Sequence, residues 1–210
     1  MPSERLRILG GVWKNRLLTL PKEAKFRPTT ELARERLFNW LDNVYARPGE
    51  VASDDDIVSA DQNRLAWDQV RVLDLFAGSG MLSLEALSRG AKEACLVDLD
   101  RLVVANLRKL ISHLALEDRM QAILAKMPSR WARLPAHPFE LILVDPPFRF
   151  GLVAPVLARL IGSSQLTRRT MVYVECELSL QIDLGDNWQA VQTSEQGGVK
   201  QLILTPNLLD

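Results

Sequence analysis

Two short segments carry side chains that could do chemistry, and each directly follows a strand-like run. The first follows residues 141–144 and reads Asp145-Pro146-Pro147-Phe148. The prolines fix their φ angles, so the Asp145 carboxylate and the Pro146 carbonyl would be in place before a substrate arrives. Acceptors of this kind suit an exocyclic amine on a nucleobase, because hydrogen bonds to its N–H groups draw the lone pair out of conjugation. Phe148 would offer a flat face for that base, and we take these four residues as the candidate catalytic group.

The second segment ends a run that starts at residue 70 and reads DLFAGSG from Asp74 to Gly80. Gly78 and Gly80 would let the backbone turn tightly and approach a ligand without interference from a Cβ atom. A dinucleotide fingerprint requires a third glycine at position 83, where this chain has Ser83, and this argues against NAD. S-adenosylmethionine (SAM) has no pyrophosphate and does not need that glycine. A tight strand-to-helix turn without a ligand is the simpler alternative.

A carboxylate ends the next strand-like run, residues 94–98. Asp98 lies 20 residues after Gly78, a spacing at which an acid can accept hydrogen bonds from both hydroxyls of a ribose. Asp100 is the competing candidate, but it is better placed to cap a helix that begins at Arg101. In the alternative reading, both acids only cap or solvate the turn.

The elements that must position these groups alternate from residue 70 onward. Strands are expected at 71–76, 94–98, 120–124, 140–144 and 170–176. Helices are expected at 80–89, 101–114, 126–134 and 151–162. Segments 188–193 and 199–205 read as an antiparallel hairpin. The pattern predicts an α/β protein with the class I SAM-dependent methyltransferase (Rossmann-like) fold, in which a mostly parallel seven-stranded sheet has helices on both faces and ends in that hairpin.

The chain divides by charge into three parts, predicted as an arm at 1–47, an acidic loop or linker at 48–69 and a catalytic domain at 70–210. The arm contains ten Lys or Arg and five acidic residues, an excess of +5, although the whole chain has net charge +0. We expect a small hairpin within 5–20 and a helix from Thr29 or Thr30 to about Leu41. A basic arm beside a neutral body suggests a polyanionic partner, and a solvated surface is the simpler alternative.

The composition narrows the class of protein. A chain of 210 residues is one domain or one domain with a small appendage. No apolar run approaches the ~20 residues of a membrane helix, and the N-terminus lacks a signal-peptide pattern. Cys95 and Cys176 lie in apolar runs and are expected to be free thiols in a reducing compartment, the cytoplasm. His113 and His137 have no partner at metal-ligand spacing, so no metal site is predicted.

The chain resembles the RsmD family of 16S rRNA guanine-N2 methyltransferases, which act on guanine 966. The resemblance rests on six stretches, of which the first two are the most specific: RILGGVWKNRLL (7–18), RPTTELARERLFNWL (27–41), VLDLFAGSGMLSLEALSRGA (72–91), LVDLDR (96–101), LILVDPPF (141–148) and VYVECE (172–177).

The resemblance implies SAM as cofactor and 16S rRNA, within the small ribosomal subunit or an assembly intermediate, as substrate. It implies SAM contact by Asp74, Phe76, Ala77, Gly78, Ser79, Gly80, Asp98 and Leu99. It places the target amine at Asp145, Pro146, Pro147 and Phe148. It implies RNA contact by Arg7, Lys14, Arg16, Arg27 and Thr29. We further expect a monomer.

Three other functions fit part of the pattern. The DPPF turn would serve an adenine N6 methyltransferase on DNA or RNA equally well, and only the N-terminal stretches favour rRNA guanine. An rRNA-binding assembly factor with little turnover is suggested by residues 125–128, which read AKMP where the family has a polar residue that holds the adenine amine. A dehydrogenase is disfavoured by Ser83.

Overall fold

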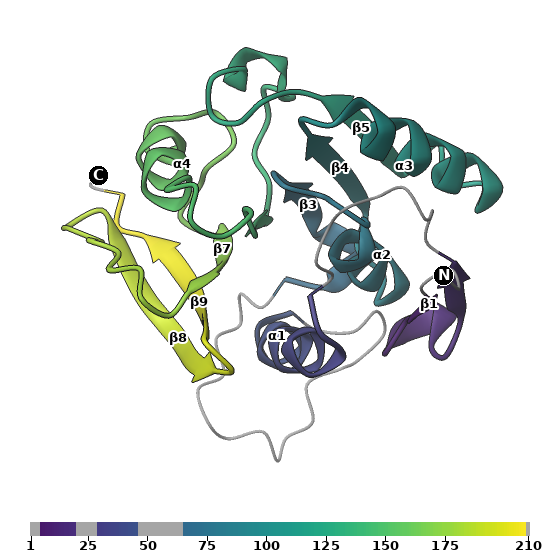
Figure 1. The fold of residues 1–210 in the computed structure, drawn as a ribbon, viewed down its shortest axis with the longest axis horizontal. Coiled ribbons are helices and arrows are strands. Elements are labelled where there is room, and N and C mark those ends of the chain that lie inside the picture. Colours follow the sequence, from purple (N-terminus) through teal and green to yellow (C-terminus); the bar gives the residue numbers. More distant parts are fainter. Residues whose placement is uncertain (1–4, 20–28, 46–64, 209–210) are drawn as a thin grey trace.

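A twisted seven-stranded sheet runs through the middle of the computed structural model, which describes residues 5–19, 29–45 and 65–208 (Figure 1). Its strands are β3 (Arg71–Asp74), β4 (Glu93–Asp98), β5 (Met120–Leu124), β6 (Leu141–Val144), β7 (Met171–Glu177), β8 (Trp188–Gln196) and β9 (Val199–Pro206). Their order across the sheet is β5-β4-β3-β6-β7-β9-β8. Neighbours from β5 to β7 are parallel, whereas β9 and β8 are antiparallel. The predicted methyltransferase fold with its terminal hairpin is therefore confirmed.

The chain reverses its direction across the sheet between β3 and β6. After β3 it proceeds outward through β4 and β5, and it then crosses back to β6 on the other side of β3. The two strands are paired in parallel, with Leu73 opposite Ile142 and Asp74 opposite Leu143. In open α/β sheets, ligands bind outside the carboxyl ends of the strands at such a switch point. The glycine loop and the DPPF turn both leave the sheet there.

Helices cover both faces of the sheet, because alternate residues of each buried strand point to opposite faces. The α-helices are α1 (Glu31–Val44), α2 (Met81–Ser88), α3 (Arg101–His113) and α4 (Val153–Leu160). The 3₁₀ helices are η1 (Gly11–Trp13), η2 (Trp67–Gln69) and η3 (Trp131–Arg133). Val72 and Leu96 pack in one hydrophobic cluster with residues of α1, α2 and α3. Leu73 and Val97 pack in a second cluster with η3 and α4.

The helix predicted at 126–134 is wrong. Only η3 forms there, and it is one turn long. Pro128 disfavours the helical conformation at the preceding residue, Met127, so a helix is not favoured to run through the start of this segment. The Trp131 indole instead donates a hydrogen bond to Gln165 Oε1 at 2.9 Å, which fixes the turn against the loop after α4. The other predicted helices and strands are present, with ends shifted by a few residues.

The N-terminal hairpin is present and packs on the sheet domain. Strand β1 (Arg5–Arg7) pairs in antiparallel fashion with β2 (Leu17–Thr19). Leu6, Ile8 and Leu18 are buried in the same cluster as α1 and α2. Figure 1 shows α1 lying between this hairpin and the β8–β9 hairpin. The division at residues 47 and 69 remains a prediction, since most of the acidic segment lies outside the described residues.

Close contacts dock this hairpin against α2. Gly11 has φ +74°, and a Cβ atom there would lie 1.8 Å from the Ser88 carbonyl oxygen. The backbone N–H of Trp13 donates to Ser88 Oγ at 2.9 Å. Only glycine allows the chain to come this close to the Ser88 backbone, so packing against α2 explains Gly11.

A buried ion pair joins the hairpin, α1 and α2. Arg34 is fully buried and donates to Glu85 Oε1 at 2.9 Å and to the Arg7 carbonyl at 2.9 Å. Glu85 Oε1 also accepts from the Leu9 backbone N–H at 2.6 Å. Because removing one partner of such a pair leaves an uncompensated buried charge, this contact ties the arm firmly to the body.

Cys95 and Cys176 are both buried free thiols, as expected. Within the ranges that the structure describes, each helix is too short or too polar to cross a membrane. Those same ranges contain no grouping of three His, Cys, Asp or Glu side chains that could hold a metal ion.

Candidate active site

A cavity of about 710 Å³ lies at the carboxyl ends of β3, β4, β6 and β7 and is closed on one side by α1 and the β8–β9 turn. It joins the two segments that the sequence singled out. On one side it is lined by Asp74, Phe76, Ala77, Gly78, Ser79, Asp98 and Leu99. On the other side it is lined by Asp145, Pro146, Pro147, Phe148 and Thr29. One chamber therefore contains both a donor-type and an acceptor-type set of groups.

Gly80, also predicted as a cofactor contact, has a different position. It has φ +72° and precedes the first residue of α2. A Cβ atom there would lie 2.7 Å from Leu107 Cδ2 and 3.0 Å from Leu96 Cδ2. Gly80 thus lets α2 begin close to α3 and β4, whereas Gly78, with φ +49°, lines the cavity.

Asp98 forms the floor of the cavity beside the glycine loop. Its Oδ2 accepts from the Gly78 backbone N–H at 3.1 Å, and its Oδ1 accepts from the Asp100 N–H at 2.9 Å. Burial raises the pKa of Asp98, while these backbone hydrogen bonds lower it. Asp100 caps α3 by accepting from the Leu102 N–H at 2.7 Å, as predicted. Asp98 therefore lines the cavity without capping α3.

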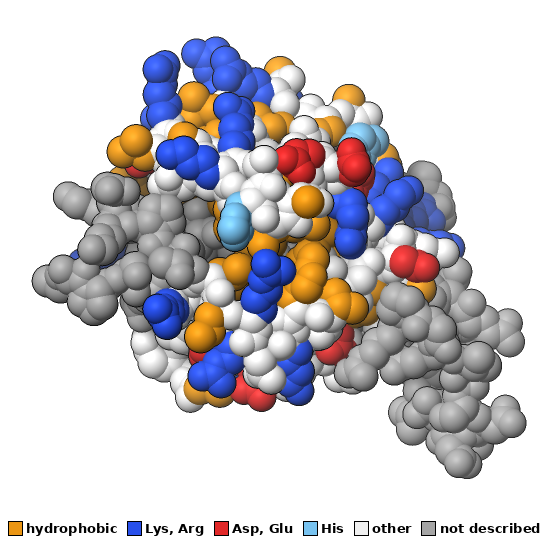
Figure 2. All heavy atoms as spheres, turned by 90° about the vertical axis from the view of Figure 1, so that its right-hand side faces the viewer, with side chains coloured by type: hydrophobic (Ala, Val, Ile, Leu, Met, Phe, Trp, Pro, Cys, Tyr) orange, Lys and Arg blue, Asp and Glu red, His pale blue; other side chains and the backbone are white. Residues whose placement is uncertain are grey.

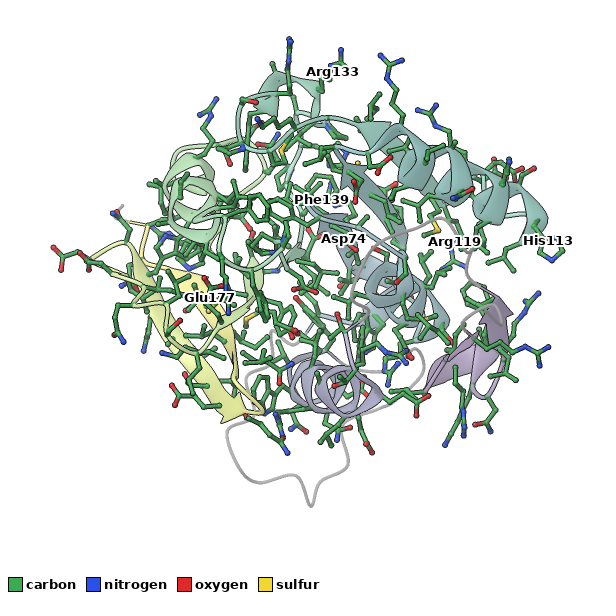
Figure 3. The ribbon with its side chains drawn as sticks, in the orientation of Figure 1. Asp74, His113, Arg119, Arg133, Phe139 and Glu177 are labelled. Atoms are coloured by element: carbon green, nitrogen blue, oxygen red, sulfur yellow. The ribbon has the colours of Figure 1, made fainter. Side chains whose placement is uncertain are left out.

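Asp74 is a buried acid with incomplete hydrogen bonding. It is labelled near the middle of Figure 3, at the end of β3, and is almost fully buried. Its Oδ2 accepts from the Ser83 hydroxyl at 2.9 Å, and its Oδ1 has no partner among the described residues. Burial raises the pKa of Asp74 to about 7. Ser83, which breaks the dinucleotide fingerprint, thus has a structural use, and Asp74 would gain from a cationic ligand group nearby.

Asp145 follows β6 and lies on the opposite side of the cavity from Asp98. Thr29, which is 116 residues away in the chain, donates its hydroxyl hydrogen to Asp145 Oδ2 at 2.9 Å. Pro146 is buried, and Phe148 is half-buried at the cavity wall. Thr30 provides the N-cap of α1, with its Oγ1 accepting from Ala33 N–H at 3.2 Å. The sequence predicted the cap and an RNA contact at Thr29, but not this bond.

Further polar residues that the sequence analysis missed line the acceptor side. They are Arg36 on α1, Glu175 on β7, and Gln196 and Gln201 on the β8–β9 hairpin. Arg36 donates to Gln201 Oε1 at 3.0 Å and also to Gln196 Oε1. A sequence signal existed for Glu175, because an acid follows the apolar part of a predicted strand. The glutamines could not be found in this way, since they depend on how the hairpin folds over α1.

Three of the predicted RNA-contacting cations do not line the cavity. Arg7, Lys14 and Arg16 are exposed on the N-terminal hairpin, and Arg27 lies outside the described residues. The hairpin contacts Ser88, the last residue of α2. The other end of α2 lies at the cavity, and the helix is about 12 Å long. Figure 2 shows the face that includes α3 and this hairpin, with basic side chains at several places across it. Such cations could contact phosphates some distance from a base held in the cavity.

Comparison with known proteins identifies the family of this chain. A family model described as "Conserved hypothetical protein 95" matches residues 6–205. "Ribosomal RNA small subunit methyltransferase D" of Escherichia coli K12 is 36% identical over 177 residues, which cover 84% of this chain and 77% of the relative. The protein of that name from Haemophilus influenzae is 28% identical, over 91% of this chain and 89% of the relative.

Solved structures show the same fold. The yhhF protein of Escherichia coli has a TM-score of 0.75 and 30% identity, over 97% of this chain and 98% of that chain. An RNA methyltransferase from Salinibacter ruber, solved with S-adenosyl-L-homocysteine, has a TM-score of 0.56 at 15% identity, over 88% of this chain and 97% of that one. With a family match over almost its whole length and a relative at 36% identity, this chain belongs to the RsmD family of methyltransferases.

Proposed function

We propose that this protein transfers a methyl group from SAM to the exocyclic N2 amine of guanine 966 in 16S rRNA. The observation that supports the reaction type is the single cavity, in which the glycine loop and Asp98 face the Asp145-Pro146-Pro147-Phe148 turn. Support for the rRNA substrate comes from relatives named ribosomal RNA small subunit methyltransferase D. Support for guanine comes from the N-terminal stretches that resemble the family.

The donor side of the cavity fits SAM in three respects. Asp98 is held by two backbone N–H groups with lone pairs left for the hydroxyls of a ribose. The unpartnered Asp74 Oδ1 suits the ammonium of the methionine part, either directly or through water. Leu99 is 56% exposed and offers an apolar surface for a flat ring. When bound, SAM supplies an electrophilic methyl group on its sulfonium.

The acceptor side would act on the target amine through fixed acceptors. Asp145 and the Pro146 carbonyl accept hydrogen bonds from the amine, which frees its lone pair for attack. The nitrogen–carbon bond forms as the carbon–sulfur bond breaks, and the Asp145 carboxylate stabilises the positive charge that develops on the nitrogen. The amine then loses a proton to water through this carboxylate. Phe148 stacks against the base and holds its plane in line with the methyl group.

Arg7, Lys14 and Arg16 would contact RNA phosphates outside the cavity. Three exposed cations give few phosphate contacts, so charge alone would not bind unstructured RNA tightly. We therefore propose that the substrate is a small subunit or an assembly intermediate, in which an unpaired guanine is already presented and the unstacking cost of a few kcal/mol is avoided. The protein would act as a monomer in the cytoplasm, and its mass in solution can be measured by light scattering.

The decisive experiment incubates the protein with labelled SAM and with small subunits that lack the methyl group, followed by digestion and identification of the nucleoside. Asp145→Ala should transfer ~10²-fold more slowly or worse, with SAM affinity close to wild type, because a preorganised charge partner is lost. Asp118→Ala, an exposed acid after α3, is the control. N6-methyladenine as the product would instead establish the adenine enzyme. Tight rRNA binding without any transfer by the wild type would establish an assembly factor.

A further inference from the structure

Glu175 is a buried acid in the cavity to which the reaction described above gives no role. Strands β6 and β7 are parallel neighbours, and Val144 pairs with Val174. The next residue along each strand is Asp145, just after the end of β6, and Glu175, which is still within β7. The two therefore start from neighbouring backbone positions, near the ~4.8 Å spacing of adjacent strands. Both line the cavity. The acceptor side thus presents two neighbouring carboxylates where methyl transfer to an amine requires one.

The Glu175 carboxylate is oriented by a buried network. Glu175 is 7% exposed, and the Tyr173 hydroxyl donates to its Oε2 at 2.7 Å. Tyr173 is itself fully buried and accepts a hydrogen bond from Gln201 Nε2 at 2.6 Å. Gln201 in turn donates to the Ala33 carbonyl of α1 at 3.2 Å. A carboxylate can accept about four hydrogen bonds, and Glu175 lines the cavity, so a donor on a ligand held there can reach it.

The bases that carry an exocyclic amine differ in the atom beside that amine. In guanine the N2 amine adjoins N1–H, a second donor. In adenine and cytosine the amine adjoins a ring nitrogen that has a lone pair and no hydrogen. A carboxylate facing this neighbouring position accepts a hydrogen bond from guanine. With adenine or cytosine, its lone pairs would instead be repelled by the lone pair of the ring nitrogen. A site built around a hydrogen bond to its substrate rejects analogues that lack the donor, because its own polar group is then left unpaired.

We infer that Glu175 is a specificity-determining residue that selects guanine by accepting the N1–H hydrogen bond, while Asp145 accepts from the N2 amine. The inference rests on the proposed guanine-N2 function and identifies how this chain distinguishes guanine from adenine. The DPPF turn serves any exocyclic amine, so the selection has to come from a neighbouring group. Glu175 lies on the adjacent strand, β7, and has the required chemistry.

The test compares two acceptors in reconstituted small subunits, with guanine or 2-aminopurine at the target position. 2-Aminopurine keeps the 2-amine but has a bare N1. The wild type should methylate guanine roughly 10- to 100-fold faster, the factor for one hydrogen bond to a charged group. Glu175→Gln should slow transfer to guanine. It should also lower the ratio of the guanine rate to the 2-aminopurine rate, because the amide N–H of the glutamine can face the bare N1 of 2-aminopurine. SAM affinity should stay unchanged. Glu195→Gln, which changes an exposed acid on β8, is the matched control.

The ratio separates base selection from a structural role. A merely structural Glu175 would slow transfer to both bases equally, so an unchanged ratio in Glu175→Gln would overturn the inference. If that variant does not fold, Tyr173→Phe provides the same test. Loss of the hydroxyl that orients Glu175 should also lower the ratio of the guanine rate to the 2-aminopurine rate. An unchanged ratio in Tyr173→Phe would refute the selection of guanine by Glu175. If the wild type forms a product other than N2-methylguanine, the proposed function itself is wrong. If it forms N2-methylguanine but the rate ratio is unchanged in Glu175→Gln, only the role of Glu175 is wrong.

Discussion

The hydrogen bond from Thr29 to Asp145 leads to the sharpest prediction. Thr29 lies just before α1, in the segment expected to contact RNA, yet its hydroxyl donates to the acceptor carboxylate at 2.9 Å. The change Thr29→Val keeps the shape of the side chain and replaces the hydroxyl, the donor to Asp145, with a methyl group. We therefore expect it to affect how Asp145 is held while the cavity keeps its form.

The magnitude follows from the kind of bond that is lost. A hydrogen bond to a charged group contributes about 1.5–3 kcal/mol. Since each 1.36 kcal/mol changes a rate tenfold, transfer should slow by about 10- to 100-fold. The loss should fall on kcat, because a misplaced carboxylate weakens the stabilisation of charge in the transition state. SAM affinity should not change, since Asp98 and the glycine loop lie on the other side of the cavity.

Single-turnover transfer of labelled methyl groups to undermethylated subunits measures the rate, and calorimetry measures SAM binding. Thr29→Ser restores the hydroxyl and should recover most of the rate. Thr193→Val, an exposed position on β8, controls for the chemistry of the substitution. A Thr29→Val enzyme with wild-type kcat would refute the positioning role. If its RNA affinity fell at the same time, Thr29 would be the RNA contact that the family resemblance implies.

Other predictions concern cofactor, RNA and stability. Asp98→Ala should weaken SAM binding by about 1.5–3 kcal/mol in calorimetry, and unchanged affinity would contradict the ribose contact. Lys14→Ala and Arg16→Ala should each reduce the slope of log K against log salt for subunit binding by about one, and wild-type slopes would exclude phosphate contacts there. Glu85→Leu should lower the free energy of unfolding in urea by about 3–5 kcal/mol, because Arg34 keeps a buried charge without its counter-ion. A loss under 1 kcal/mol would show that the pair contributes little.

The sheet and the place of the site could be predicted because they depend on local patterns. Residues 141–144 are apolar at every position, as expected for a strand buried on both faces, and each is buried. The alternation of such runs with helical segments determines a parallel sheet, and the carboxyl ends of its central strands then lie together. The motifs at 74–80 and 145–148 therefore meet in one cavity.

The contacts that join distant segments could not be predicted in the same way. Nothing near Thr29 in the sequence indicates Asp145, and Glu175 becomes a neighbour of Asp145 only through the register of β6 and β7. Arg34 is an intermediate case. It shares one face of α1 with Leu37, Phe38 and Leu41, so helical periodicity could have shown that this arginine is buried. The periodicity would still not have identified Glu85 as its partner.

The start of α1 links the parts that this reaction must coordinate. Thr29 bonds the acceptor carboxylate, and Arg34, little more than one turn later, bonds both the hairpin and α2. A hairpin held by a buried ion pair would not move freely if it contacts RNA as proposed, because separating Arg34 from Glu85 would cost several kcal/mol. Its cations therefore stay at a fixed distance from the acceptor turn. A rigid spacing of this kind favours RNA whose backbone already has the matching shape, which is the physical reason to expect an organised particle as the better substrate.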